Sequence, residues 1–253
     1  VHSQERVVEL LLRHGAEVNL QDSNGVTALM VATLFNHPAV VRRLLRAGAD
    51  TAARAENGKT ALQWAKEEGN AECVEAFRQH VKESVVAGRP AATAAGGEGA
   101  GGASSGGASS AGSRVAKTPS PAAAAGRASS GGVAVSDEVV AAAGRGEEAV
   151  VLAWLEGGGR VNATCETYEA SGLTLLIHAA NGGHERVVDL LLQHGAEINL
   201  QSSKGVTALM TAANCGHERV VELLLRHGAE INLQNSIGST ALMAAAGQGH
   251  ERV

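Results

Sequence analysis

The chain has 253 residues, a formal net charge of −5 at pH 7, 44% hydrophobic residues and only 2% aromatic residues. A negative charge with few aromatic rings disfavours nucleic-acid binding, which needs clustered Lys and Arg for phosphates and rings for bases. No apolar run reaches the length that spans a bilayer. A core made of Ala, Val and Leu favours thin, closely packed helices.

The first 80 residues contain a short motif at a fixed step. The sequence G-V-T-A-L starting at Gly25 recurs as G-K-T-A-L at Gly58, 33 residues later, and L-L-x-x-G-A keeps the same step. A fixed period of this size indicates stacked supersecondary units. Residues 27–33 predict a short helix, Pro38 starts a second helix, and Gly48 ends it. Each unit is therefore expected to be helix, turn, helix, loop.

Gly, Ala and Ser dominate residues 81–135. Such a segment cannot bury enough apolar surface to offset its ordering entropy, so we expect a disordered, flexible linker. Its Thr118-Pro119 and Ser120-Pro121 dipeptides match proline-directed phosphorylation sites.

The period returns in residues 136–253. G-V-T-A-L-M starts at Gly205, G-S-T-A-L-M starts at Gly238, and a looser copy at Gly172 follows a longer loop. Two helical stretches in residues 136–162 lack the motif and are expected to form an N-terminal cap. Residues 49–80, with a polar last helix, are expected to close the first array as a C-terminal cap.

These units resemble ankyrin repeats over roughly 200 residues. The copy that starts at Ser202 matches the family pattern at Gly205, Thr207, Leu209, Ala212, Ala213, Gly216, His217, Val220, Val221, Leu224, Leu225, Gly228, Ala229 and Asn232. The family's His is Met at 30, 210 and 243, which trades a loop hydrogen bond for packing. The resemblance implies an all-α solenoid: ankyrin repeats with a C-terminal cap over 1–80, the linker over 81–135, and an N-terminal cap with ankyrin repeats over 136–253.

The two arrays have complementary ends. The second array lacks its final helix and the first lacks its opening helix, so the chain is interpreted as a fragment. Residues Glu5–Glu17 are also identical to Glu218–Glu230. We expect helix Gln4–Arg13 to complete the last repeat, either within one chain or head to tail between chains. A linker of about 50 residues spans roughly 40 Å, enough for the first arrangement. Two separate half-arrays remain the alternative.

The resemblance implies a protein or peptide partner on the concave face, at the family's variable contact positions. These are Asn24, Val26, Leu34, Phe35, Lys204, Val206, Asn214, Cys215, Ile237, Ser239 and Gln248. Leu34 and Phe35 replace small or polar residues found there in other copies, which makes them hot-spot candidates. The alternative is that Phe35 packs on the neighbouring capping repeat. The family also implies hydroxylation of hairpin asparagines, here Asn19, Asn199 and Asn232.

Several patterns imitate catalytic or metal-binding signatures without their structural context. Gly58-Lys59-Thr60 fits a relaxed phosphate loop, but its Gly and Thr belong to the repeat motif. His217-Glu218 resembles a zinc helix, yet Val221 stands where the second ligand would be. His184 and His217 are instead expected to cap and pack helices. We therefore expect no catalytic, cofactor or metal site.

Three cysteines, Cys73, Cys165 and Cys215, are far apart and form no C-x-x-C pair. They are expected to be reduced thiols in an intracellular protein, cytoplasmic rather than nuclear. The sequence thus predicts a non-catalytic interaction scaffold. Two alternatives remain: the targeting segment of a larger enzyme of the kinase or ubiquitin-ligase type, or a recently expanded array with no settled ligand.

Overall fold

A computed structural model describes residues 2–86, 135–165 and 171–248 of the chain. Most of the predicted linker, with Thr118 and Ser120, lies outside these described residues, as does part of the loop before Gly172. The described parts belong to one compact unit.

Helices dominate the described residues, with one two-stranded antiparallel ladder, β1–β2. The elements are α1 (His2–Arg13), α2 (Ala28–Leu34), α3 (Pro38–Arg46), α4 (Ala61–Glu67), α5 (Ala71–Val86), α6 (Asp137–Arg145), α7 (Glu148–Glu156), β1 (Thr164–Cys165), β2 (Leu173–Thr174), α8 (Leu175–Gly182), α9 (Glu185–Gln193), α10 (Ala208–Cys215), α11 (Glu218–Arg226) and α12 (Ala241–Gly247).

Threonine starts the first helix of each repeat. The Thr207 side chain accepts a hydrogen bond from the backbone N–H of Met210 at 3.2 Å, and Thr240 caps α12 in the same way at 3.3 Å from Met243. Such a cap satisfies one of the N–H groups left free at a helix start. Met210 and Met243 are buried, so the predicted packing of these side chains is confirmed.

Glycine ends the second helix of each repeat, as the sequence predicts. Gly48 and Gly228 adopt φ values of 88° and 86°, a left-handed conformation that residues with a Cβ rarely adopt. The preceding His227 places its Nδ1 atom 2.9 Å from the carbonyl oxygen of Leu223. The imidazole therefore adds a contact to a carbonyl that also accepts the backbone N–H of His227 at 3.1 Å.

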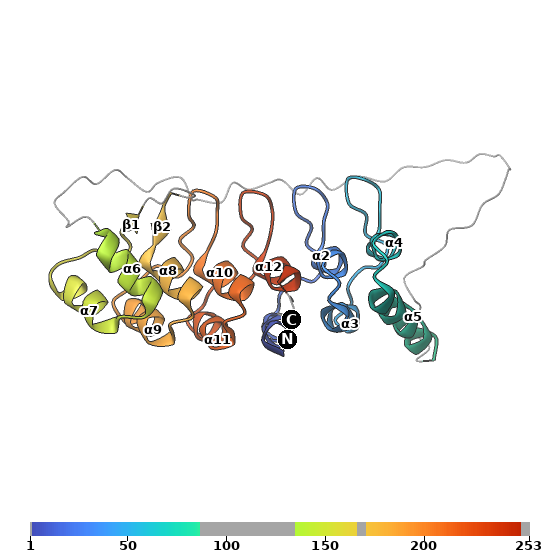
Figure 1. Cartoon of the computed structure of the whole chain (residues 1–253), viewed down its shortest axis with the longest axis horizontal. Coiled ribbons are helices and arrows are strands. Elements are labelled where there is room, and N and C mark those ends of the chain that lie inside the picture. Colours follow the sequence, from blue (N-terminus) through green and yellow to red (C-terminus); the bar gives the residue numbers. More distant parts are fainter. Residues whose placement is uncertain (1, 87–134, 166–170, 249–253) are drawn as a thin grey trace, which may run out of the picture. The chain divides into compact units, whose positions relative to one another are not determined.

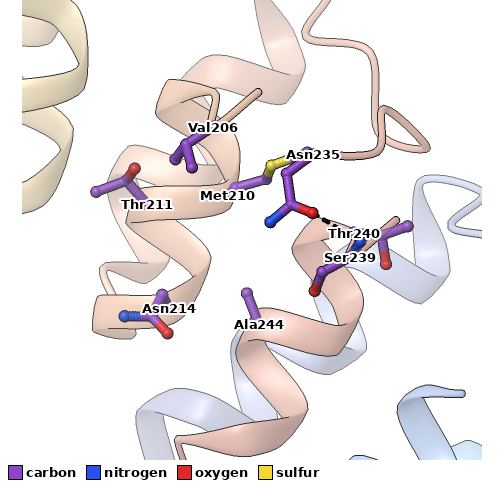
Figure 2. A pocket seen from close by; sticks show the side chains of 8 residues that line it. All are labelled: Val206, Met210, Thr211, Asn214, Asn235, Ser239, Thr240 and Ala244. Carbon is purple, nitrogen blue, oxygen red and sulfur yellow. Dashed lines mark hydrogen bonds between the residues drawn. The ribbon is translucent and has the colours of Figure 1, made fainter. Parts of the chain in front are cut away.

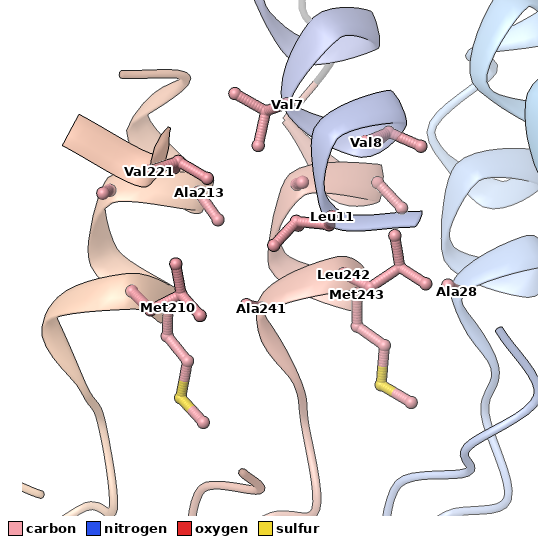
Figure 3. Close-up of a cluster of buried hydrophobic side chains, with 14 of the residues drawn as sticks. Val7, Val8, Leu11, Ala28, Met210, Ala213, Val221, Ala241, Leu242 and Met243 are labelled. Carbon is pink, nitrogen blue, oxygen red and sulfur yellow. The ribbon is translucent and has the colours of Figure 1, made fainter. Parts of the chain in front are cut away.

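Helix α1 completes the repeat that α12 begins. It packs on α12 and α11, in the place that α11 takes beside α10 (Figure 1). Val7, Val8 and Leu11 are fully buried in a cluster with Leu242 and Met243 (Figure 3). The arrangement within one chain is therefore the one in the structure, and residues 2–86 continue the array formed by residues 136–248. We call the boundary between these two segments the seam.

The same hydrogen bonds cross the seam as cross an ordinary repeat boundary. Gln234 Nε2 donates to the carbonyl of Gln21 at 3.1 Å, as Gln201 Nε2 donates to that of Gln234 at 3.0 Å. The backbone N–H of Ser23 donates to the carbonyl of Ile237 at 2.9 Å. The seam is therefore built like any other boundary between these repeats.

The G-H histidines do not cap helices, contrary to the sequence-based expectation. His184 and His217 stand at the N-cap positions of α9 and α11, but neither side chain makes a capping hydrogen bond. Their Nε2 atoms instead lie 2.9 Å from the carbonyl oxygens of Gly144 and Asn181 in the preceding units. Each of these two histidines therefore joins its helix pair to the preceding one.

The ends of the array differ from its middle. Helices α6 and α7 pack on α8 and α9, and they lack the repeat motif. At the other end α5 continues to Val86, past the expected boundary at residue 80. Among the residues that the structure describes, no helix has the length and hydropathy needed to cross a membrane.

Candidate protein-binding face

The hairpin loops and the first helices α8, α10, α12, α2 and α4 make one continuous surface, here called the finger-loop face (Figure 1). Successive loops are tied by backbone hydrogen bonds of 2.8–2.9 Å, for example from Ser236 N to the carbonyl of Lys204 and from Glu56 N to that of Asn24. These bonds fix the loop backbones and leave side chains of the loop tips free to contact a partner.

An open hollow of about 330 Å³ lies on this face between α10 and α12. It is lined by Val206, Met210, Thr211, Asn214, Asn235, Ser239, Thr240 and Ala244 (Figure 2). None of these side chains is charged. Methyl and thioether groups mix with amide groups, which suits an apolar side chain together with peptide groups that need hydrogen bonds.

The Asn235 amide orders the rim of the hollow. Its Oδ1 accepts hydrogen bonds from the backbone N–H groups of Ile237 at 3.1 Å and Ser239 at 2.8 Å. On the opposite wall, the hydroxyl of Thr211 donates to the carbonyl of Thr207 at 3.0 Å. The hollow is thus held open by bonds within its walls.

An apolar patch follows on the next repeat. Leu34 and Phe35, at the end of α2, are 44% and 46% exposed, values high enough for contact with a partner. The Phe35 ring stacks on His37 with centroids 6.4 Å apart. Across the seam, a Cβ placed on Gly247 would lie 3.2 Å from Val31 Cγ1 and 3.6 Å from the Phe35 ring. We call Val31, Leu34, Phe35 and Gly247 the Phe35 patch.

The structure gathers some of the sequence-predicted contact residues and separates others. Val206, Asn214 and Ser239 line the hollow. The remaining predicted residues are Asn24, Lys204 and Ile237 in the loops, Val26 beside Gly25, Cys215 at the end of α10, Leu34 and Phe35 in the Phe35 patch, and Gln248 after α12. Val26, Val206 and Ser239 are half-buried, and the other predicted contact residues are exposed.

Sequence reasoning missed one row of this face. The sixth residue after each motif glycine is His178, Thr211, Ala244, Val31 or Trp64, and two of these line the hollow. Aligning the copies on the glycine would have found the row. His178 therefore corresponds to Thr211, and Ile177 takes the buried place of Met210.

Cys165 and His178 form a neutral pair. The Cys165 Sγ lies 3.1 Å from His178 Nε2 and also contacts the carbonyl of Leu173 at 3.3 Å. Burial raises the pKa of the Cys165 thiol and lowers the pKa of the His178 imidazole. Both shifts oppose the thiolate–imidazolium form that a cysteine nucleophile requires.

The other cysteines are free thiols. Cys73 is buried, and burial is the main cause that raises its pKa to about 11. Cys215 is exposed, its thiol donates to Asn181 Oδ1 at 3.4 Å, and partial burial of its sulfur raises its pKa. Over the described ranges, no group of three or more His, Cys, Asp or Glu side chains could hold a metal ion.

The residues that imitate a phosphate loop belong to the repeat. Thr60 caps α4, and Gln63 completes a capping box with it. The Lys59 ammonium lies 2.5 Å from the Glu67 carboxylate. The side chains of Lys59 and Thr60 therefore make their ion pair and their capping hydrogen bond within the last repeat.

Comparison with family models supplies the class of the protein. The model for ankyrin repeats (three copies) matches residues 2–86 and 139–235, more than half of the chain. The chain belongs to the ankyrin-repeat family. Ankyrin repeats are generally protein–protein interaction modules. A search of curated proteins found no match.

Proposed function

We propose that this chain is a non-catalytic scaffold that binds a protein or peptide segment on its finger-loop face. The observation that carries the proposal is the succession of an uncharged hollow and the Phe35 patch on neighbouring repeats. Exposed aromatic and aliphatic side chains beside a hollow are typical of binding hot spots. The three cysteines as free thiols agree with the proposed intracellular location.

Selection from a random peptide library on the intact chain tests this function. The Leu34→Ser/Phe35→Ser variant serves as the counter-target. Val81→Ser/Val85→Ser is the matched control, because these valines are 48% and 69% exposed but lie on α5. We expect selected peptides to lose binding to the first variant and keep it with the second. Peptides that bind all three proteins equally would contradict the proposal.

The alternative, a targeting segment of a larger enzyme, uses the same face. It differs from the scaffold only in requiring a catalytic domain in the same reading frame. The sequence of the full reading frame therefore distinguishes the targeting segment from the scaffold. The Cys165–His178 pair gives no support to catalysis within the described residues, because both groups are held neutral.

Head-to-tail self-association is a second proposal, carried by the non-covalent seam. If residues 2–86 of one copy docked on residues 136–248 of another, every seam contact would be retained between chains. Light scattering over a range of concentrations tests it. A mass that rises with concentration supports exchange, while a constant monomer mass contradicts it.

Hydroxylation of Asn19, Asn199 and Asn232 also remains a proposal. Each side chain accepts a hydrogen bond from a backbone N–H of the following repeat, at 2.8–2.9 Å. A modifying enzyme would have to break these bonds, so local opening must come first. Intact mass of the protein from its own cells tests the proposal, and a mass without added oxygen would contradict it.

A further inference from the structure

The candidate site is divided between the two segments that meet at the seam. The hollow is lined by residues 206–244, whereas Val31, Leu34 and Phe35 belong to the segment 2–86. The two halves meet on α12, where Ala244 lines the hollow and Gly247, one turn later, approaches Val31 and Phe35. The site is therefore complete only when the seam is closed.

The contacts that close the seam reach the site itself. Gln4 Nε2, on α1, donates a 3.0 Å hydrogen bond to the carbonyl of Asn214, a residue that lines the hollow. The backbone N–H of Ser23 also donates a 2.9 Å hydrogen bond to the carbonyl of Ile237, beside the rim of the hollow. Arg6 and Glu218 add an exposed ion pair at 3.5 Å, which contributes little. None of these contacts is covalent.

The absence of charge along this path defines the chemistry of the occupant. The residues that line the hollow and form the Phe35 patch present Val, Met, Leu and Phe side chains together with amides and hydroxyls, and none of them is ionisable. His37, on which Phe35 stacks, is buried. A partner that buried a charge here would leave it without an opposite charge, which is unfavourable. The complementary occupant is an uncharged peptide segment with apolar side chains.

We infer that such a segment binds across the seam, so that partner binding and docking of residues 2–86 onto residues 136–248 are coupled. The inference rests on the proposed function and adds a mechanism to it. A ligand that contacts both segments stabilises the closed seam, and by reciprocity a closed seam raises the affinity for the ligand. The chain would then hold its partner only while its two segments are joined as one array.

The coupling can be measured after the covalent link between the segments is cut. A protease site is introduced into residues 87–134 of the full chain and cleaved after folding, so that no covalent bond joins the two pieces. The dissociation constant of the pieces is then measured with and without a saturating peptide that was selected on the intact chain and depends on Leu34 and Phe35. We expect the peptide to lower this constant by about tenfold or more.

The outcomes separate the inference from the proposed function. An unchanged dissociation constant would overturn the coupling and leave peptide binding intact. Failure to select any peptide that depends on the Phe35 patch would overturn the proposed function, and the coupling with it. If the two pieces did not associate without peptide, the docking of residues 2–86 on residues 136–248 would be contradicted. As a control, the same peptide should have no effect on cleaved Leu34→Ser/Phe35→Ser protein.

Discussion

Asn232 and Glu17 are 215 positions apart in the chain and are joined by two hydrogen bonds. Asn232 Oδ1 accepts from the backbone N–H of Glu17 at 2.9 Å, and its Nδ2 donates to the Glu17 carboxylate at 3.2 Å. Asn199 makes the same two bonds, at 2.9 and 3.2 Å, to Glu230 in the following repeat. The seam therefore reproduces an internal boundary down to the individual bonds.

Leu11 and Leu224 allow the seam to be tested within one protein. They occupy the same place in identical sequence, on α1 and α11, and both are fully buried. We expect Leu11→Ala and Leu224→Ala each to lower the free energy of unfolding by about 2 to 5 kcal/mol, measured by denaturant titration. A near-zero effect of Leu11→Ala beside a large effect of Leu224→Ala would show that α1 is not docked.

Alanine substitutions at three motif glycines should lower the stability of the protein to different extents. Gly238 has φ 78°, and a Cβ there would lie 2.8 Å from Ser23 N across the seam. Gly205 has the same 2.8 Å approach to Ser236 N, whereas Gly58, with φ 74°, has nothing within 4 Å. All three variants incur backbone strain of about 1 to 2 kcal/mol.

Gly238→Ala and Gly205→Ala should lose more stability than Gly58→Ala, by about 1 to 3 kcal/mol, because they also force two loops apart. Thermal unfolding of the three variants measures the difference. If Gly238→Ala behaved like Gly58→Ala while Gly205→Ala did not, the loops at the seam would not be in contact.

Phe35 should matter more for binding than for stability. Its side chain is 46% exposed, so Phe35→Ala is expected to lower the free energy of unfolding by no more than about 2 kcal/mol. The same change should weaken a selected peptide about tenfold or more, measured by calorimetry. A large loss of stability with unchanged affinity would make Phe35 a packing residue, the other interpretation of the sequence.

His178, on α8, should make the end of the array that α6 and α7 cap lose stability in acid. Burial lowers its pKa in the folded protein below the unfolded value, so the unfolded state binds the proton more readily. The stability that the neutral imidazole contributes is therefore complete above the unfolded pKa and is lost as the pH falls towards the folded pKa.

Thr211 supplies the matched replacement, because it holds the same position in the next repeat. His178→Thr should lose less stability than the parent chain between pH 7.5 and about 5, measured by denaturant titration at each pH. Equal losses in both proteins would assign the acid sensitivity to other groups.

The repeat architecture could be predicted from the sequence because its signals are local. Threonine caps, the glycine stops at Gly48 and Gly228, and buried Met210 and Met243 each follow from a few neighbouring residues. The sequence left three arrangements possible: α1 docked on α12 of the same chain, α1 docked on another chain, or two separate half-arrays. Docking of α1 on α12 was therefore not predicted uniquely. It depends on contacts between segments far apart in the chain, and the local pattern of α1 is the same in each arrangement.

The binding face could be predicted only in part. Leu34 and Phe35 stood out because their type differs from that of the same positions in other copies. The hollow did not, because its walls come from two repeats and its space results from small side chains such as Ala244 and Ser239. The G-H histidines were misassigned because a residue at a helix start can bond its own helix or the preceding repeat, and sequence does not distinguish these.

Native-state hydrogen exchange of the Ala244 amide tests the central claim most directly. Ala244 N donates to the carbonyl of Thr240 at 3.0 Å in α12, as Thr211 N donates to that of Thr207 at 3.1 Å in α10. With α1 docked, we expect the two amides to have similar protection at protein concentrations where the chain is monomeric. Rapid exchange at Ala244 with slow exchange at Thr211 would contradict the account, because α12 would then lack its partner helix.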